Sequence, residues 1–228
     1  MKFFKQNPAY AFLSVLFFAC LYIWVLLLSP HGSDGVVTVK ALDAAVFGAV
    51  EPEASSLQKV RAILAAQGGE DGLGAVQKTS GCAVRGPLPD SLCTPGSVFA
   101  TAGTSTICVS GYTKTVRSVS TKLRKQIYAA YNIAYPPPTG TYELDHLVPL
   151  AIGGDNSAAN LFPEAATPKP GFREKDVVEV YLQREVCAGN LDLVAAQKQV
   201  ATDWVVVYKA LDSGTVSEIK QKYRNWSN

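Results

Sequence analysis

Apolar and polar positions divide the chain into an apolar run, an irregular stretch and a patterned C-terminal half. The run at residues 9–28 carries no charged side chain, and about 20 such residues suffice for a helix that spans a bilayer. Residues 29–80 are rich in Gly, Ala, Ser and acidic residues and indicate a tether. Within it, residues 56–67 have amphipathic spacing and predict a short helix. We expect a compact domain over residues 81–228.

The C-terminal half alternates between strand-like and helix-like patterns. Segments rich in β-branched and aromatic residues predict strands at 106–110, 142–149 and 160–162. Apolar residues at helical spacing predict helices at 120–131, 174–186 and 191–211. Asp192 or Asn190 is expected to cap the last of these, and Trp204 and Tyr208 are expected in its core face. The predicted fold class is therefore α+β, preceded by one N-terminal transmembrane helix.

The flanks of the apolar run indicate its orientation. Lys2 and Lys5 precede it, and no Lys or Arg follows before Lys40. The positive-inside rule then keeps residues 1–8 in the cytoplasm and exports the domain. A cleaved signal peptide is the alternative, but its apolar core is shorter, at about 7–15 residues, and it ends at a small-residue site. No such site follows Leu28, so we expect an uncleaved single-pass anchor.

The cysteines divide into Cys20, in the apolar run, and four in the predicted domain. Those four are Cys82, Cys93, Cys108 and Cys187. An even number on the exported side predicts two disulfides. Four cysteines permit three pairings, and the spacing alone selects none of them. A zinc site fits less well, because the domain has no C-x-x-C pair and only one histidine.

Charge is uneven along the chain, although the net charge is only +2. Residues 91–142 contain no Asp or Glu but do contain Lys114, Arg117 and Lys122. A basic surface of this kind suits a polyanion such as nucleic acid. The alternative interpretation is a solvated helix face whose Lys and Arg side chains point to water.

Asp145 and His146 lie next to each other within the predicted strand at 142–149. A histidine can take the proton from an attacking water, and a carboxylate can hold a divalent ion against a phosphate. Adjacent strand residues point to opposite faces. The two side chains can therefore serve one site only where the strand ends or is distorted.

The sequence around this pair resembles the HNH, or His-Me finger, nucleases. The resemblance is carried by Tyr-Glu-Leu-Asp-His-Leu-Val-Pro at 142–149, Gly-Gly at 153–154 and Asn-Leu-Phe-Pro-Glu at 160–164. It is clearest over residues 140–186. Segments similar to small bacterial exported HNH-like proteins extend it to about residues 87–208. The ordered set D-H-x-x-P, G-G and N-L is more specific than the Asp-His pair alone.

The resemblance implies a ββα-metal core and a role for each matched residue. His146 is expected to be the general base, and Asp145 a metal-binding acid. Asn160 is expected to hold the loop that carries the histidine. The implied cofactor is Mg²⁺, with Mn²⁺ or Zn²⁺ as alternatives. Cys108 and Cys187 flank the matched region, and we hypothesise that they pair with each other.

The sequence departs from the family pattern at the start of the following helix. The pattern expects a His or Asn there, but residues 171–176 read Gly-Phe-Arg-Glu-Lys-Asp. Glu174 is the expected second metal ligand, and Glu164 is a further carboxylate that could serve. Arg173 can grip a phosphate. Lys175 and Asp176 are interpreted as an ordinary pair at a helix start.

The expected function is metal-dependent hydrolysis of nucleic acid, with DNA as the expected substrate, by a membrane-anchored extracytoplasmic endonuclease. The alternative is a catalytically degenerate module of the same fold that binds nucleic acid or a cell-envelope polymer. The missing His or Asn on the helix is the feature that favours this alternative. The sequence indicates no protein partner.

Overall fold

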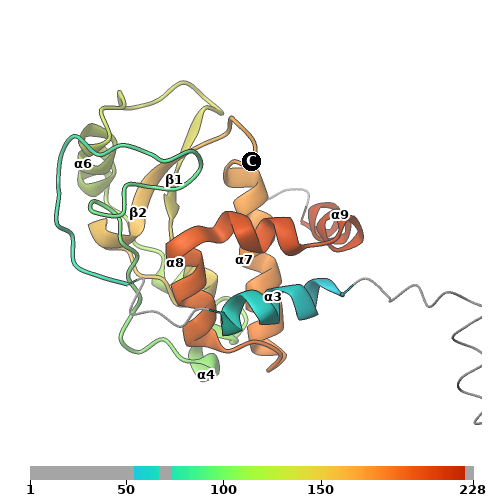
Figure 1. Ribbon diagram of the computed structural model, residues 1–228. Coiled ribbons are helices and arrows are strands. Elements are labelled where there is room, and N and C mark those ends of the chain that lie inside the picture. The colour runs from blue at the N-terminus through green and yellow to red at the C-terminus, as the bar shows by residue number, and fades with distance from the viewer. Residues whose placement is uncertain (1–53, 67–72, 224–228) are drawn as a thin grey trace, which may run out of the picture. The chain divides into compact units, whose positions relative to one another are not determined.

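The computed structural model describes residues 54–66 and 73–223 (Figure 1). The expected anchor at residues 9–28 and Cys20 lie outside the described residues. Within the part that is described, no helix is long and apolar enough to cross a membrane. The described residues form a mixed α+β structure whose sheet has two strands.

The sheet is an antiparallel pair of short strands. Strand β1 (Tyr142–His146) pairs with β2 (Leu161–Ala165), and the Cα partners run from Tyr142 opposite Ala165 to His146 opposite Leu161. Both strands were predicted, but β1 ends earlier than the expected residue 149. Past His146 the facing residues Ala158–Asn160 form a 3₁₀ turn, and the backbone N–H and carbonyl of Val148 bond to the side chain of Asn160 instead of to a strand. His146 is therefore the last residue of its strand.

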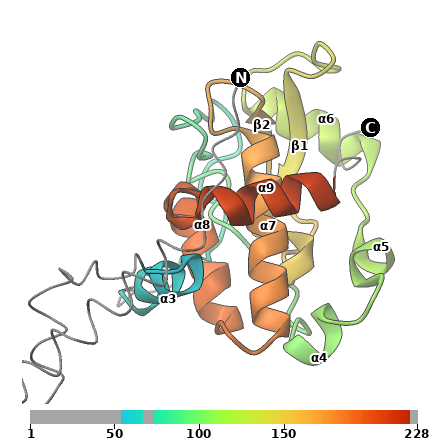
Figure 2. The same cartoon turned by 90° about the vertical axis from the view of Figure 1, so that its right-hand side faces the viewer.

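Two long helices pack against each other, and the first of them also contacts β1 (Figures 1 and 2). They are α7 (Phe172–Cys187) and α8 (Leu193–Ala210), close to their predicted bounds. The side chain of Asp192 accepts a hydrogen bond of 2.8 Å from the N–H of Ala195 and caps α8 as expected. Helix α8 is kinked at Asp203, which has a non-helical backbone with φ −163° and ψ 99°.

The predicted strand at 106–110 is wrong. Its residues fall in the short helix α4 (Thr104–Ile107) and the turn that follows. The N–H of Gly103 donates to Oγ1 of Thr106 at 3.0 Å, and the N–H of Ile107 donates to the Gly103 carbonyl, so a helical turn closes. The described residues offer this segment no partner strand, and β-propensity without a partner does not make a strand.

The remaining helices surround this core. Helix α6 (Thr121–Ala130) is close to its predicted range and is capped by Ser120, while α5 (Tyr112–Val116) and α9 (Ser213–Lys222) were not predicted. Figure 2 shows α9 crossing α7, which it contacts.

The predicted tether at 29–80 contains part of the packed domain. Helix α3 (Ser56–Ala65) packs against α8 and buries Val60 and Leu64. The hydroxyl of Ser56 donates to the carboxylate of Asp212 and accepts from its N–H. This helix therefore has partners far away in the sequence, which composition alone does not reveal.

The core contains the side chains of α7 and α8 that the apolar pattern predicted. Trp204 is fully buried, as expected, and Tyr208 packs against the core. Two disulfides join parts of the domain that lie apart in the sequence. Cys82 bonds to Cys93, and Cys108 bonds to Cys187, which confirms the hypothesised pair. Disulfides indicate an oxidising, extracytoplasmic compartment.

Candidate functional site

The loop that follows β1 is held by one buried amide side chain. Oδ1 of Asn160 accepts from the N–H of Val148 at 2.8 Å, and its Nδ2 donates to the carbonyls of Val148 and Asp155, both at 2.9 Å. Gly153 has a φ of +88°, and a Cβ on Gly154 would overlap the carbonyl of Val148. The Gly-Gly pair is thus required because the loop turns back so closely on the backbone of Val148.

His146 is buried at the strand end, with 3% of its surface exposed. Its Nε2 lies 3.1 Å from Oδ1 of Asn156, and Nδ2 of Asn156 donates to the carbonyl of Val116 at 2.7 Å. Because that second bond fixes which end of the amide faces the imidazole, Nε2 must carry the proton. Nδ1 is then the proton acceptor, and no described residue is hydrogen-bonded to it.

Burial lowers the pKa of His146, and the charges of Arg117 and Lys175 act in the same direction, while Asp145 and the bond to Asn156 oppose them. The imidazole is therefore neutral at neutral pH, which is the form that can accept a proton. Asn156 was not among the residues expected to form the site. Its place two residues after the Gly-Gly pair gives no sign that its side chain points back to the strand end.

Asp145 connects the strand end to the helix. Its Oδ1 accepts from the N–H of His146 at 2.7 Å, and its Oδ2 accepts from Nζ of Lys175 at 2.9 Å. Burial opposes ionisation, but the Lys175 ammonium and neighbouring hydrogen bonds outweigh it and bring the pKa of Asp145 to about 2. The side chain keeps 20% of its surface exposed.

Lys175 lies at the centre of the site, and the sequence interpretation missed it. Its side chain is fully buried. Nζ donates to Oδ2 of Asp145 at 2.9 Å, to the carbonyl of His146 at 2.7 Å and to Oε1 of Glu179 at 2.6 Å. Burial alone would lower the pKa of Lys175, but the carboxylates of Asp145 and Glu179 raise it above its usual value. The ammonium is therefore charged, and its three protons are all used.

Further carboxyl groups surround this lysine. Glu164 is 1% exposed, and neither of its oxygens receives a hydrogen bond from a described donor. Burial raises the pKa of Glu164 well above its usual value, and its neighbour is the carboxyl of Asp145. Burial therefore favours the protonated, uncharged form of this side chain. Burial and nearby carboxylates also raise the pKa of Asp176, to about 7.

Glu174, the expected second metal ligand, is used elsewhere. Its Oε2 accepts from the N–H of Gly171 at 3.0 Å and from Nζ of Lys169 at 2.8 Å, and its Oε1 lies 3.3 Å from Nζ of Lys220. The side chain caps the first turn of α7 and pairs with two lysines. No described contact joins it to Asp145.

A divalent metal does not fit the residues that surround Asp145. In the described ranges, no three His, Cys, Asp or Glu side chains are arranged to hold a metal ion. The oxygens of Asp145 and Glu179 that face the centre of the site are bound to an ammonium instead. The four cysteines of the domain are in disulfides, so none of them is a thiolate ligand for zinc.

A cavity of about 330 Å³ lies next to this cluster. It is lined by Arg117, Asp176 and Glu179 among others. The four predicted phosphate-contacting residues are all exposed: Lys114, Arg117, Lys122 and Arg173. Of these, Arg117 lines the cavity and acts electrostatically on His146, and Lys114 lies one turn before it on α5. The guanidinium of Arg173 lies 5.5 Å from the ring of Phe172, and Lys122 lies on α6.

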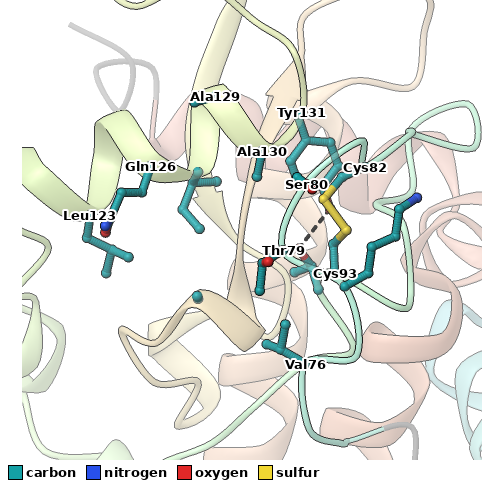
Figure 3. Close-up of a pocket in the computed structure, with 14 residues that line it drawn as sticks. Val76, Thr79, Ser80, Cys82, Cys93, Leu123, Gln126, Ala129, Ala130 and Tyr131 are labelled. Atoms are coloured by element: carbon teal, nitrogen blue, oxygen red, sulfur yellow. Dashed lines mark hydrogen bonds between the residues drawn. A yellow bond between two sulfur atoms is a disulfide. The ribbon is translucent and has the colours of Figure 1, made fainter.

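A larger cavity, of about 470 Å³, lies elsewhere (Figure 3). Leu123 and Gln126 of α6, Tyr131 and the Cys82–Cys93 disulfide line it. Asp145, His146 and Lys175 are not among its lining residues. Its walls offer neither a carboxylate nor a histidine, so it is not the candidate catalytic site.

No family model, curated protein or solved structure matches this chain. The geometry at the end of β1 is therefore what indicates a function.

Proposed function

We propose that this protein hydrolyses phosphodiester bonds of nucleic acid at an HNH-type site in which His146 is the general base. The observation that carries the proposal is the bond between Nε2 of His146 and Asn156, which leaves Nδ1 of a neutral imidazole as the proton acceptor. A general base needs this protonation state at the operating pH. The strand–loop–strand–helix order around it, with Asn160 closing the loop, supports the same proposal.

The reaction needs one proton transfer to the protein. Nδ1 of His146 takes a proton from water as the water oxygen bonds to phosphorus. The bond between phosphorus and the leaving sugar oxygen breaks, and that oxygen takes a proton from solvent. The exposed guanidinium of Arg117 can neutralise phosphate charge, since a guanidinium matches phosphate geometry. No step is assigned to a metal, because the residues present do not fit one.

The disulfides indicate that the protein meets its substrate outside the cytoplasm. DNA remains the first substrate to test, with RNA beside it. Anchoring to a membrane through residues 9–28 remains a prediction.

The test is a hydrolysis assay of the full-length protein on plasmid DNA, single-stranded DNA and RNA. We expect wild type to be active and His146→Asn to lose at least about 100-fold in rate. Asparagine is chosen because His146 is buried, and truncation to alanine would leave a cavity. Arg85→Gln is the matched control, since Arg85 is exposed and does not line the cavity that Arg117 lines. An inactive wild type, on all three substrates, would contradict the proposal.

A nucleic-acid-binding module without catalysis is the second candidate. The observation that favours it is the buried Lys175, which stands on the helix where the family pattern expects His or Asn. In that case wild type and His146→Asn bind nucleic acid equally and neither hydrolyses it. Binding that falls in Arg117→Gln but not in Arg85→Gln would then identify the surface.

A further inference from the structure

The carboxylate cluster at the end of β1 already contains a cation. We infer that the buried ammonium of Lys175 takes the place of a divalent metal at this site, and that the site works without one. This inference rests on the proposed phosphodiester hydrolysis. It makes the chain a metal-independent variant of an otherwise metal-dependent arrangement.

The contacts of Lys175 are complete. Its three N–H groups donate to Oδ2 of Asp145, the carbonyl of His146 and Oε1 of Glu179, at 2.9, 2.7 and 2.6 Å. These are short, charge-assisted hydrogen bonds. The side chain is fully buried, so neither water nor substrate competes for the ammonium. Two of the acceptors, on Asp145 and His146, belong to β1, and the third, on Glu179, belongs to α7.

A divalent ion cannot be added to this arrangement without removing the lysine. Mg²⁺ requires nearly octahedral oxygen ligands at about 2.0–2.1 Å, whereas the three oxygens here are spaced around an ammonium. Placing Mg²⁺ among them would set it against the positive charge of the ammonium and take away the oxygens that hold that charge. A buried charge deprived of its partners is strongly destabilising.

The competing occupant is an ion between Asp145 and Glu164, because both oxygens of Glu164 lack a described donor. Mg²⁺ usually keeps several water ligands, and a side chain that is 1% exposed leaves no solvent beside it for them.

Lys175 is a positioning residue in this scheme, because it touches no substrate. It orients Asp145, which in turn accepts the N–H of His146 at 2.7 Å. It also holds the carbonyl of His146 directly. The lysine thereby fixes the backbone that presents the base.

The first experiment uses full-length wild type. Mn²⁺ alone is titrated and followed by its electron paramagnetic resonance signal, and hydrolysis is measured with EDTA and with added Mg²⁺. We expect no stoichiometric Mn²⁺ binding and the same rate in both buffers. Stoichiometric binding that is lost in Asp145→Asn or Glu164→Gln would overturn the inference, as would activity that EDTA abolishes.

The second experiment changes the cation. Lys175→Asn removes the ammonium, frees three oxygens and adds an amide oxygen. We expect it to gain Mn²⁺ binding, to lose at least about 100-fold in rate in EDTA because the base is misplaced, and to recover part of that loss with Mn²⁺. Lys169→Asn is the control, since Lys169 is an exposed lysine that pairs with Glu174. A folded Lys175→Asn that keeps full activity in EDTA would contradict the inference.

The two proposals fail in different ways. If wild type hydrolyses nothing, the proposed function fails, but the Mn²⁺ titration still tests whether Lys175 is the resident cation. If wild type is active only with a divalent metal, the proposed function stands and the inference about Lys175 fails.

Discussion

The two disulfides close loops of very different length, and this difference makes a quantitative prediction. Cys108 and Cys187 are 79 residues apart, whereas Cys82 and Cys93 are 11 apart. In the chain-entropy model, a cross-link restricts the unfolded chain more when its loop is longer. The model gives about 4–5 kcal/mol for the long loop and about 3 kcal/mol for the short one. The long-range disulfide should therefore contribute more to the free energy of unfolding.

The perturbation is paired replacement by alanine, as C108A/C187A and as C82A/C93A. Alanine is used because Cys82 and Cys93 are buried, and a serine hydroxyl there would add a desolvation cost to the measurement. Urea unfolding is followed by circular dichroism at equal protein concentration. We expect C108A/C187A to lose the larger free energy, by about 1–2 kcal/mol over C82A/C93A.

An equal or reversed order would refute the loop-closure reasoning for this protein. It would mean that packing around the buried Cys82–Cys93 pair outweighs the entropy of the longer loop. The slope of the unfolding free energy against urea concentration is a check on this comparison of the two variants. A changed slope signals a change in the denatured state rather than in the native contacts alone. Midpoints are compared only if the slopes agree.

Three further predictions concern the site. Burial lowers the pKa of His146 from 6.5, and the imidazole can act as a base only when it is neutral. The rate of hydrolysis should therefore fall as pH drops through a midpoint below 6.5. A midpoint above 6.5 would contradict this. Lys175→Met leaves the carboxylates around it without their cation and should cost about 3 kcal/mol in urea unfolding, whereas Lys169→Met should cost no more than about 1 kcal/mol; equal losses would show that the buried contacts add nothing. Arg117→Gln should raise KM, and the dependence of its substrate binding on salt concentration should weaken by about one phosphate contact relative to Arg85→Gln. Matching KM values in the two variants would show that Arg117 does not contact the substrate.

Local pattern was enough to predict the elements that carry the site. The β-branched and aromatic residues around Asp145 and Asn160 and the helical spacing after residue 174 are local features of the sequence, so β1, β2 and α7 were predicted. The Cys108–Cys187 bond was hypothesised from its position on either side of the matched region and is present. The strand predicted at 106–110 was wrong because a strand also needs a neighbouring strand to pair with. The local sequence pattern does not reveal whether the fold supplies such a partner.

The contacts that define the chemistry were not predicted, for a different reason. Lys175 is one position past Glu174, and a lysine at a helix start usually points to solvent. Its long side chain instead reaches across to the end of β1, and that direction depends on how α7 packs against the sheet. Asn156 depends likewise on the carbonyl of Val116, 40 residues away. Such contacts follow from tertiary packing and leave no periodic signal.

The burial of Lys175 also separates two roles that a single metal ion would perform together. A divalent ion both holds its carboxylate ligands and neutralises charge on the phosphate. A fully buried ammonium can do only the first, since it has no exposed surface. The second must then come from an exposed group next to the base, and Arg117 is the described cation that both lines the adjoining cavity and acts on His146. Loss of Lys175 should therefore lower the rate by misplacing the base, while loss of Arg117 should weaken the interaction with phosphate, and a double variant should show both effects.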